Sequence, residues 1–595
     1  MKYNLFLVLV LLGFSNALIA ADEVVVTPAR YSQTIDEVIP SVIVIDRETI
    51  ERTPSADVAD LLRWYAGIEI GRTGGYGQQT SVFVRGANSN HTAVLINGVK
   101  MNSATTGAPA LEIINASVIE RIEIIKGPRS TVYGSEALGS VINIITTTDE
   151  AKGYAAAHIS HGRYSTTEQG VDLKAVNDYV IGDFSFNRID SDGFPATTTS
   201  NTDQGHDSDT LDVNIKTKLG KSNWKFGYWQ AKGNTEYDGF GIDLDQDRKN
   251  DVLNATFSMP VTEKWFSNLS VSKIRDEIRQ NQMNFLGDED FAFTDRIVYD
   301  WKNDISIIDN LFTFGISKTD EDTESLSFGT RYRENTDHYS LYANQQFNVG
   351  KHSVFGSTSY VDHNDFGDAT LWNAEYGYKA SKKSRIFASL GTGFRAPDSN
   401  ARFGFGGNPD LKEETSRSIE LGVNYDINQY NDLSFRAYEN KIENLIETIL
   451  IDPGAFTFEN RNVSDARIQG LELKFQHQSN HWDVNLEGTI KNPRNETNDS
   501  PLLRRAKRSL NTSLVYTYDK YFVQLNGLLS SERRDFGDVN LSGYGLVDLS
   551  AGVYFLNAAF SVKVDNLFDK DYELASGFNT PGQSVFAELR LKFTE

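Results

Sequence analysis

Aspartate is concentrated in two neighbouring segments of this chain. Carboxylate oxygens are the ligands that Ca²⁺ prefers, and two adjacent loops that carry them could enclose one ion. Asp243, Asp245 and Asp247 begin like an EF-hand loop. Arg248 stands where that loop requires glycine, so an EF-hand is excluded. A calcium site and a merely solvated acidic surface both remain open. The first segment holds Asp190, Asp192, Asp203, Asp207 and Asp209, and the second holds Asp238, Asp243, Asp245 and Asp247.

The other chemistry-bearing residues lack the context of a catalytic or cofactor site. Residues 391–396 fit the dinucleotide pattern G-x-G-x-x-A, but Pro397 follows, so no helix N-terminus is there to hold a pyrophosphate. His477 and His481 lie in a polar segment, which favours solvent exposure over metal binding. There is no nucleophile elbow, no recognisable Ser-His-Asp set and no cysteine. These residues indicate binding rather than catalysis, and we expect no enzyme activity.

Charge and hydropathy narrow the partners and the fold. The net charge of -23 argues against nucleic acid or anionic lipid as a ligand. After the N-terminal segment there is no long apolar run, so a transmembrane helix is not predicted. The remaining way to cross a bilayer is a closed β-barrel, in which lipid-facing and lumen-facing residues alternate and so escape a hydropathy search.

The N-terminus has the layout of a secretory signal followed by a short strand-former. Lys2 precedes an apolar run at 5–14 and a small-residue stretch at 17–21, a pattern too short to span a membrane. A β-branched segment comes next and suits strand addition to the sheet edge of another protein. The chain is therefore predicted to be exported and to offer this strand to a periplasmic partner. Its residues are Asp22, Glu23, Val24, Val25, Val26 and Thr27, before Pro28.

The pattern of the sequence changes near residue 150. Before it, strand-like runs, a helical pattern at 58–65 and polar loops indicate a compact mixed domain. After it, many segments alternate with period two. Apolar and polar residues alternate strictly at 560–565, and one face of 224–228 is wholly aromatic, as a membrane-interface girdle requires. A soluble β-solenoid or sandwich is the alternative for this second region.

Several motifs resemble the plug and barrel signatures of TonB-dependent outer-membrane receptors. They occur in order along the whole chain, at residues 82–86, 94–99, 122–130, 132–139, 391–397, 408–411 and 466–472. The resemblance implies an all-β membrane protein: a 22-stranded antiparallel transmembrane β-barrel with a mixed α/β N-terminal plug inside the lumen. A barrel of that size has a plugged lumen.

The resemblance also implies domain boundaries, location and energy source. Residues 1–20 are expected as the signal peptide, 21–30 as the TonB-box segment, 31–150 as the plug and 151–595 as the barrel. The protein is expected in the cell outer membrane of a Gram-negative bacterium, as a monomer in contact with outer-membrane lipid and without nucleic acid. Periplasmic TonB is the expected partner and would pull on residues 22–27 to drive active import.

Within that family the likeness is greatest to receptors that carry cobalamin, because of the run at 501–507. Neutral polar plug loops suit a broad, amide-fringed cargo better than an anionic siderophore. Arg504 and Arg505 resemble a stretch that reaches the ligand from the barrel wall, with plug–barrel ion pairing as the alternative. The plug residues so implied as ligand contacts are Tyr76, Gln78, Gln79, Thr105 and Thr106.

The resemblance extends to the two aspartate segments, which bind calcium in the cobalamin receptors. Ca²⁺ is the one cofactor expected here. A ferric-siderophore or haem receptor is the competing function within the family, and a passive porin or an outer-membrane hydrolase competes from outside it. The plug argues against a porin, and the missing catalytic constellation argues against a hydrolase. The matching calcium ligands are Asp192, Asp207, Asp209, Asp238 and Asp245.

Overall fold

The computed structural model describes residues 25–26, 30, 33–34, 38–53, 55, 57–148, 152–239, 241–281, 289–307, 310–452 and 457–594. The predicted signal peptide lies outside the described residues, as do Asp22, Glu23, Val24 and Thr27 of the predicted TonB box. Val25–Val26 form strand β1, which pairs antiparallel with β2, Gln33–Thr34. The predicted strand-former is thus extended where it is described.

The N-terminal region folds into a plug built on a five-stranded sheet of order β3-β8-β9-β6-β7. β6 and β9 run parallel and the other neighbours antiparallel, so the domain is mixed as predicted. Asp46 and Asp57 cap the first two helices by accepting hydrogen bonds from the backbone N–H groups of Thr49 and Asp60. The elements are β3 Val42–Asp46, α1 Arg47–Arg52, α2 Val58–Leu62, β4 Ile68–Arg72, β5 Thr80–Val84, η1 Ser89–His91, β6 Thr92–Ile96, β7 Val99–Lys100, η2 Leu111–Ile113, η3 Ala116–Val118, β8 Arg121–Lys126, α3 Ser130–Tyr133 and β9 Ser140–Ile145.

The plug core is rich in β-branched residues. Every residue of β6 and of β9 is buried, which explains why these strands read as continuous rather than alternating apolar runs. The helix predicted at 58–65 is shorter than expected, because α2 ends at Leu62. Trp64, just beyond it, packs against Leu528 and Leu546 of the surrounding barrel.

From Tyr154 onward the described chain forms a closed antiparallel barrel, in which β10 pairs with β34 to complete the ring. Twenty-two long strands make up the wall, as predicted, and the two-residue β27 adds to the edge of β26. The strands are β10 Tyr154–Gly162, β11 Thr167–Val176, β12 Val180–Phe194, β13 Gln204–Leu219, β14 Ser222–Gly239, β15 Ile242–Pro260, β16 Trp265–Asn281, β17 Asp290–Ile307, β18 Asn310–Ser327, β19 Thr330–Val349, β20 His352–His363, β21 Gly367–Ser381, β22 Ser384–Arg395, β23 Glu414–Asn428, β24 Asn431–Asp452, β25 Thr457–Gln478, β26 Trp482–Asn495, β27 Ser500–Pro501, β28 Arg508–Tyr518, β29 Tyr521–Ser530, β32 Tyr544–Tyr554, β33 Ala558–Asp565 and β34 Ser584–Thr594.

The two ends of the barrel differ in the length of their connections. Two residues join β13 to β14, whereas residues 396–413, which include helix α4 (Ser399–Phe403), join β22 to β23. The connection between β29 and β32 also carries β30 (Arg533–Arg534), η4 (Phe536–Asp538) and β31 (Asn540–Leu541). Short turns face the periplasm in barrels of this kind and long loops face outward, which orients the molecule.

The outer face of the barrel is apolar and aromatic. Burial alternates along the whole of β20, and Val354 and Tyr360 lie on its exposed face. Trp372 and Tyr376 follow on the exposed face of β21. This is the alternation that a lipid-facing wall requires. None of the helices in the described part of the chain has the length and apolarity to cross a membrane.

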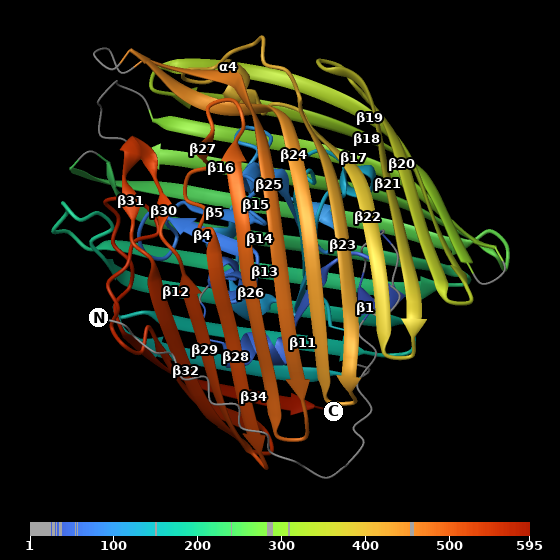
Figure 1. The fold of residues 1–595 in the computed structure, drawn as a ribbon. Coiled ribbons are helices and arrows are strands. Elements are labelled where there is room, and N and C mark those ends of the chain that lie inside the picture. The colour runs from blue at the N-terminus through green and yellow to red at the C-terminus, as the bar shows by residue number, and fades with distance from the viewer. Residues whose placement is uncertain are drawn as a thin grey trace.

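The plug lies inside the lumen, drawn in blue within the barrel in Figure 1. On one side buried ion pairs hold it to the wall. Arg85 pairs with Glu420 at 2.7 Å and with Glu472 at 2.9 Å, and Arg129 pairs with Glu375 at 2.6 Å. These five residues, with their strands β21, β23 and β25, are called the latch below.

Candidate functional site

A cavity of about 510 Å³ lies at the extracellular end, between the plug and strands β14 to β18. Two plug loops form its floor, at residues 77–81 and 103–112. The four predicted contacts from these loops, Gln78, Gln79, Thr105 and Thr106, all line this outer cavity. The structure therefore brings together on one surface residues that are far apart in the sequence.

The four residues divide into two that anchor the loops and two that are free to meet a ligand. Gln78 is buried and donates from Nε2 to the Glu236 carbonyl at 2.6 Å. Thr105 is buried, and its backbone N–H donates to Thr294 Oγ1 at 3.3 Å. Gln79 and Thr106, in contrast, are exposed. Those two side chains are the available hydrogen-bonding groups of the floor.

Tyr76 does not line the outer cavity, although it belongs to the same plug loop. It lies in a separate small space that Asp57 and His206 also border. Gly77 explains the approach of this loop to the barrel wall, because a Cβ there would lie 2.1 Å from His206 Nδ1. Burial raises the pKa of Tyr76 well above its usual value, so the phenol stays neutral. The predicted contact role of Tyr76 is therefore not supported by its position.

Arg504 and Arg505 also lie away from the outer cavity. The Arg505 guanidinium stacks 4.0 Å from the centre of the Phe83 ring, and Nε donates to the Gly86 carbonyl at 3.3 Å. Arg504 pairs with Asp535 at 2.7 Å, within the barrel's own outer connections. Arg505 thus joins plug to barrel, as the alternative to ligand contact expected. It does so through hydrogen bonds and ring stacking rather than through an ion pair.

The predicted calcium ligands are not gathered into one group. Among the described residues, no three His, Cys, Asp or Glu side chains are arranged to hold a metal ion. The aspartate segments were interpreted as loops, but Asp207 and Asp209 lie within β13. There they alternate with the buried residues that face the plug, on the same face as the exposed Ile215. This placement corrects the expected enclosure between two loops.

The neighbours of these carboxylates are other protein groups. Asp209 faces Arg188 at 3.2 Å and Lys232 at 3.5 Å. Asp245 accepts hydrogen bonds from the amides of Asn234 and Asn281. Asp238 accepts from Thr197 Oγ1 at 3.0 Å and lines the outer cavity, whereas Asp192 is exposed. As arranged, this donor set does not fit a calcium ion, and calcium binding stays a prediction.

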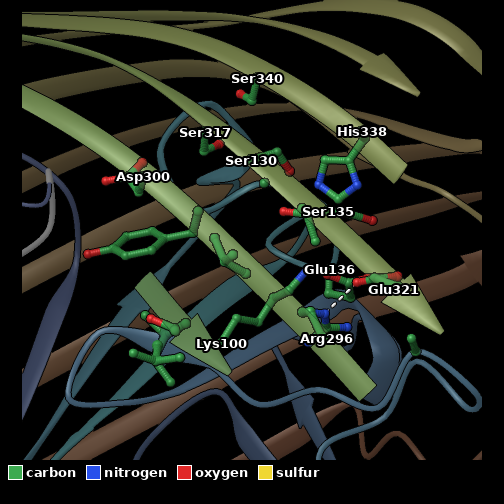
Figure 2. A pocket seen from close by; sticks show the side chains of 18 of the residues that line it. Lys100, Ser130, Ser135, Glu136, Arg296, Asp300, Ser317, Glu321, His338 and Ser340 are labelled. Carbon is green, nitrogen blue, oxygen red and sulfur yellow. Dashed lines mark hydrogen bonds and ion pairs between the residues drawn. The ribbon is translucent and has the colours of Figure 1, made fainter. Parts of the chain in front are cut away.

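A second cavity, of about 420 Å³, lies between the plug and the barrel wall, and sequence reasoning missed it. Figure 2 shows Lys100, Glu136, Arg296 and Glu321 gathered at one end of it, while Ser317 and Ser340 lie away from this cluster. Its wall is rich in hydroxyl groups contributed at alternate positions of several strands. Ser270-x-Ser272 is an example of this alternation. The alternation indicates a cavity wall only when the register of the neighbouring strands is known, because the register decides which hydroxyl groups lie side by side.

The charged groups at that end of the inner cavity are paired. Lys100 Nζ lies 2.5 Å from Glu136, and Arg296 pairs with Glu321. Burial by itself raises the pKa of Glu136, but Lys100 and Arg296 outweigh it and hold the pKa below its usual value. Glu136 is therefore ionised, and the pairs present little net charge to the cavity.

Comparisons with known proteins agree on the architecture. The model described as "TonB dependent receptor-like, beta-barrel" matches residues 153–567, and the "TonB-dependent Receptor Plug Domain" model matches residues 34–141. A solved structure of a mutant ferric enterobactin receptor from Pseudomonas aeruginosa, in complex with enterobactin, superimposes with a TM-score of 0.83. It is 16% identical and the match covers 94% of this chain and 100% of the other, a likeness that shows the fold alone.

Two curated relatives are similar over nearly their whole length. Both are named vitamin B12 transporter BtuB. The one from Vibrio vulnificus is 29% identical over 590 residues, which cover 96% of this chain and 95% of the relative. The one from Photobacterium profundum is 29% identical over 589 residues, which cover 96% of each.

Proposed function

We propose that this protein, which belongs to the TonB-dependent receptor family of the Gram-negative outer membrane, imports cobalamin by active transport. The observation that carries the proposal is the similarity, over nearly the whole of both chains, to two relatives named vitamin B12 transporters. Membership of the family accounts for the receptor architecture. The identity of the cargo has to be argued from the site.

The outer cavity has a neutral floor and a wall that carries Asp238, Asp276 and Asp290, so its chemistry disfavours an anionic cargo. Its floor offers the amide of Gln79 and the hydroxyl of Thr106, and neither carries charge. The cationic Arg248 on its wall is paired with Glu112. A corrinoid ring is broad and fringed with amides, so neutral donors and acceptors suit it, whereas an anionic chelate would leave its charge uncompensated.

The coupling to TonB is proposed to run through residues 22–27. Two of them form β1, whose pairing with β2 covers two residues, Val25 opposite Thr34 and Val26 opposite Gln33. So short a pairing is easily displaced by a partner strand. Arg30, just beyond, pairs with Asp300 of β17 at 3.1 Å, which fixes where the segment leaves the barrel wall.

One observation favours an anionic siderophore instead. On the connection between β22 and β23, where it borders the inner cavity, the Arg402 guanidinium lies over the rings of Phe366, at 4.9 Å, and Phe403, at 4.5 Å. Arginine and aromatic groups together are what an anionic aromatic chelate would contact. Arg402 is, however, already paired with Asp365 and only slightly exposed, so the neutral cargo keeps the preference.

A binding comparison on the purified protein tests the proposal. Cyanocobalamin, haem and ferric enterobactin are titrated in parallel, and we expect cyanocobalamin to bind at least about 100-fold more tightly than the other two, a difference of ~2.7 kcal/mol. The variant Arg402→Gln separates the two cargo classes, because it should weaken only an anionic chelate. Preferential binding of ferric enterobactin, lost in Arg402→Gln, would replace cobalamin by a siderophore.

A further inference from the structure

The inner cavity continues the outer one along the same barrel strands. On β17, Asp290 and Ala292 line the outer cavity, whereas Arg296, Val298 and Asp300 line the inner one. Successive inward-facing residues of a strand are about 6.6 Å apart, so the two cavities follow each other directly down the wall. The same order holds on β15, β16 and β18. The two cavities therefore lie in series along the wall and are separated where they meet.

A thin partition separates the cavities. Ser103 of the plug borders both of them, and its Oγ lies 3.4 Å from Thr294 Oγ1 of β17. On the neighbouring strand the buried Asp276 stands opposite Thr294 and is hydrogen-bonded to Ser103. Ile274 and Val252 lie one inward-facing position further along and pack into the plug core. Plug and wall therefore meet here through hydroxyl, carboxyl and apolar contacts.

Two ion pairs beside the inner cavity each form within one of the two partners. Lys100 and Glu136 both belong to the plug, and Arg296 and Glu321 both belong to the wall. A hydrogen bond from Arg296 to the Asn102 carbonyl, at 3.0 Å, crosses between them, and at the outer cavity Arg248 of β15 pairs across the boundary with Glu112 of the plug. Separating plug from wall at the inner cavity leaves these four charges with their partners, so the large penalty of a buried unpaired ion is limited to the pair of Arg248 and Glu112.

The surface beyond the partition suits weak and exchangeable hydrogen bonds. Hydroxyl groups line it from neighbouring strands, at Thr256, Ser270, Ser272, Ser317, Thr319 and Ser340. A hydroxyl group both donates and accepts hydrogen bonds, and it rotates to suit its partner. A ligand that moves along this wall can therefore exchange a hydrogen bond with one hydroxyl for a hydrogen bond with the next at a small cost in free energy. Figure 2 shows Ser317 and Ser340 on this wall.

We infer that cargo crosses the barrel between the plug and strands β15 to β19, passing the partition at Ser103 and Thr294 into the inner cavity, which is a transit site for a neutral, hydrogen-bonding cargo. The choice of a neutral cargo rests on the proposed function. The location of the route rests on the cavities and the partition alone. The plug stays attached to the wall at the latch while this side opens.

A disulfide across the partition tests the route. The chain has no cysteine, so Ser103→Cys with Thr294→Cys introduces the only thiols, at positions whose oxygens are 3.4 Å apart. Oxidised, this variant should bind cyanocobalamin with wild-type affinity and lose at least about 90% of its uptake, and reduction should restore uptake. The matched control joins another plug–barrel hydroxyl pair, Thr131 and Ser357, whose oxygens are 2.7 Å apart. Ser357 lies on β20, outside the strands of the route and away from the partition, although Thr131 also borders the inner cavity. This control should keep uptake when oxidised.

A second measurement needs no cargo, so it separates failure of the route from failure of the proposed function. Ser317→Cys is encoded in the same chain as the partition pair, and its labelling is compared with that pair oxidised and with it reduced, read from the mass of the peptide that carries residue 317. Labelling of Ser317→Cys by a maleimide, in urea too dilute to unfold the barrel, should be at least fivefold faster without the disulfide. Ser513→Cys on β28, far around the barrel, should label equally in both. Equal labelling at Ser317→Cys, or equal loss of uptake in the two oxidised pairs, would overturn the route.

Discussion

The two sides of the plug contact the barrel to different degrees. On the latch side, Arg85 and Arg129 of the plug reach carboxylates of the wall, so three deeply buried ion pairs cross the boundary. On the side of β15 to β19 two cavities lie between plug and wall, and the pairs that cross, Arg248 with Glu112 and Arg30 with Asp300, are less completely buried. A buried charge resists separation only if its partner is on the other body. The latch is therefore the firmer attachment, and the side of the cavities is the one that parts more easily.

The geometry of Arg85 shows how specific the latch is. Its φ of 52° is in the left-handed region that residues other than glycine rarely adopt, and Gly86 follows at 87°. The turn aims the guanidinium at Glu420 and Glu472 together and places it 4.3 Å from the centre of the Tyr438 ring. Lys126 reaches Glu472 as well, at 3.4 Å. The backbone is held in an unfavourable conformation so that one cation serves two strands.

The end of the chain on which TonB is proposed to pull lies on the side of the cavities. Arg30 borders the inner cavity and pairs with Asp300 of β17, and Lys302 donates to the Arg30 carbonyl at 2.8 Å. A force applied to residues 22–27 therefore acts first on the wall of the inner cavity. The latch, on other strands, is not in the line of that force.

The largest effect is expected from breaking the latch. Arg85→Met leaves Glu420 and Glu472 buried without their main partner, and such a loss costs about 3–5 kcal/mol. The free energy of unfolding of the plug, measured by denaturant titration of the purified protein, should fall by that amount. Arg461→Met removes an exposed pair with Glu459 and should leave it unchanged. An unchanged plug stability in Arg85→Met would remove the distinction between the two sides.

The next effect concerns the pulled segment. Val25→Pro removes the backbone N–H that strand addition requires, so energy-dependent uptake of cobalamin should fall about 100-fold, ~2.7 kcal/mol. Surface binding should stay at the wild-type level, because the outer cavity is untouched. Uptake by cells with and without TonB is the measurement. Undiminished TonB-dependent uptake by the variant would show that the coupling lies elsewhere.

A smaller effect is expected at the floor of the outer cavity. Gln79→Trp together with Thr106→Trp fills the floor and removes its two available polar groups, so the affinity for cobalamin should fall about tenfold, ~1.4 kcal/mol. Arg504→Gln, away from this cavity, is the control and should bind as the wild type does. Equilibrium binding decides. Wild-type affinity in the double variant would move the site from the plug to the extracellular loops.

Local patterns were enough to predict the strands and their faces, whereas the closed 22-stranded barrel and its plug followed from the family resemblance. Alternation at 560–565 corresponds to β33, and the aromatic face at 224–228 appears on β14, where the rings of Trp224 and Phe226 stack at 6.3 Å. The plug strands followed from buried Val and Ile runs in the same way. Period-two patterning dictates the strand and its faces regardless of distant contacts.

The residues of the two cavities could be predicted from the sequence only in part. Their positions depend on where each strand ends and on which strands become neighbours in the barrel. Gln79 and Thr106 of the polar plug loops line the outer cavity, and their contact with cargo stays a prediction. Tyr76 lies outside that cavity, because Gly77 lets its loop approach the barrel wall. The inner cavity requires the register of seven barrel strands, β15 to β20 and β22, which no local pattern contains.

The smallest expected effect concerns calcium, where sequence and structure disagree most. Asp207 and Asp209 were expected in a loop, but β13 extends beyond the apolar wall, and alternation turns both away from the plug. With Asp209 already beside Arg188 and Lys232, removing calcium with EGTA should change the affinity for cobalamin by less than about twofold. Binding of cyanocobalamin is measured with added Ca²⁺ and with EGTA, and Asp207→Asn with Asp209→Asn serves as the control. A gain of about tenfold with Ca²⁺, ~1.4 kcal/mol, that the double variant abolishes would show that the aspartate segments rearrange around an ion, as the sequence predicted. In that event the acidic surface, and not only the plug floor, would set the affinity for cargo.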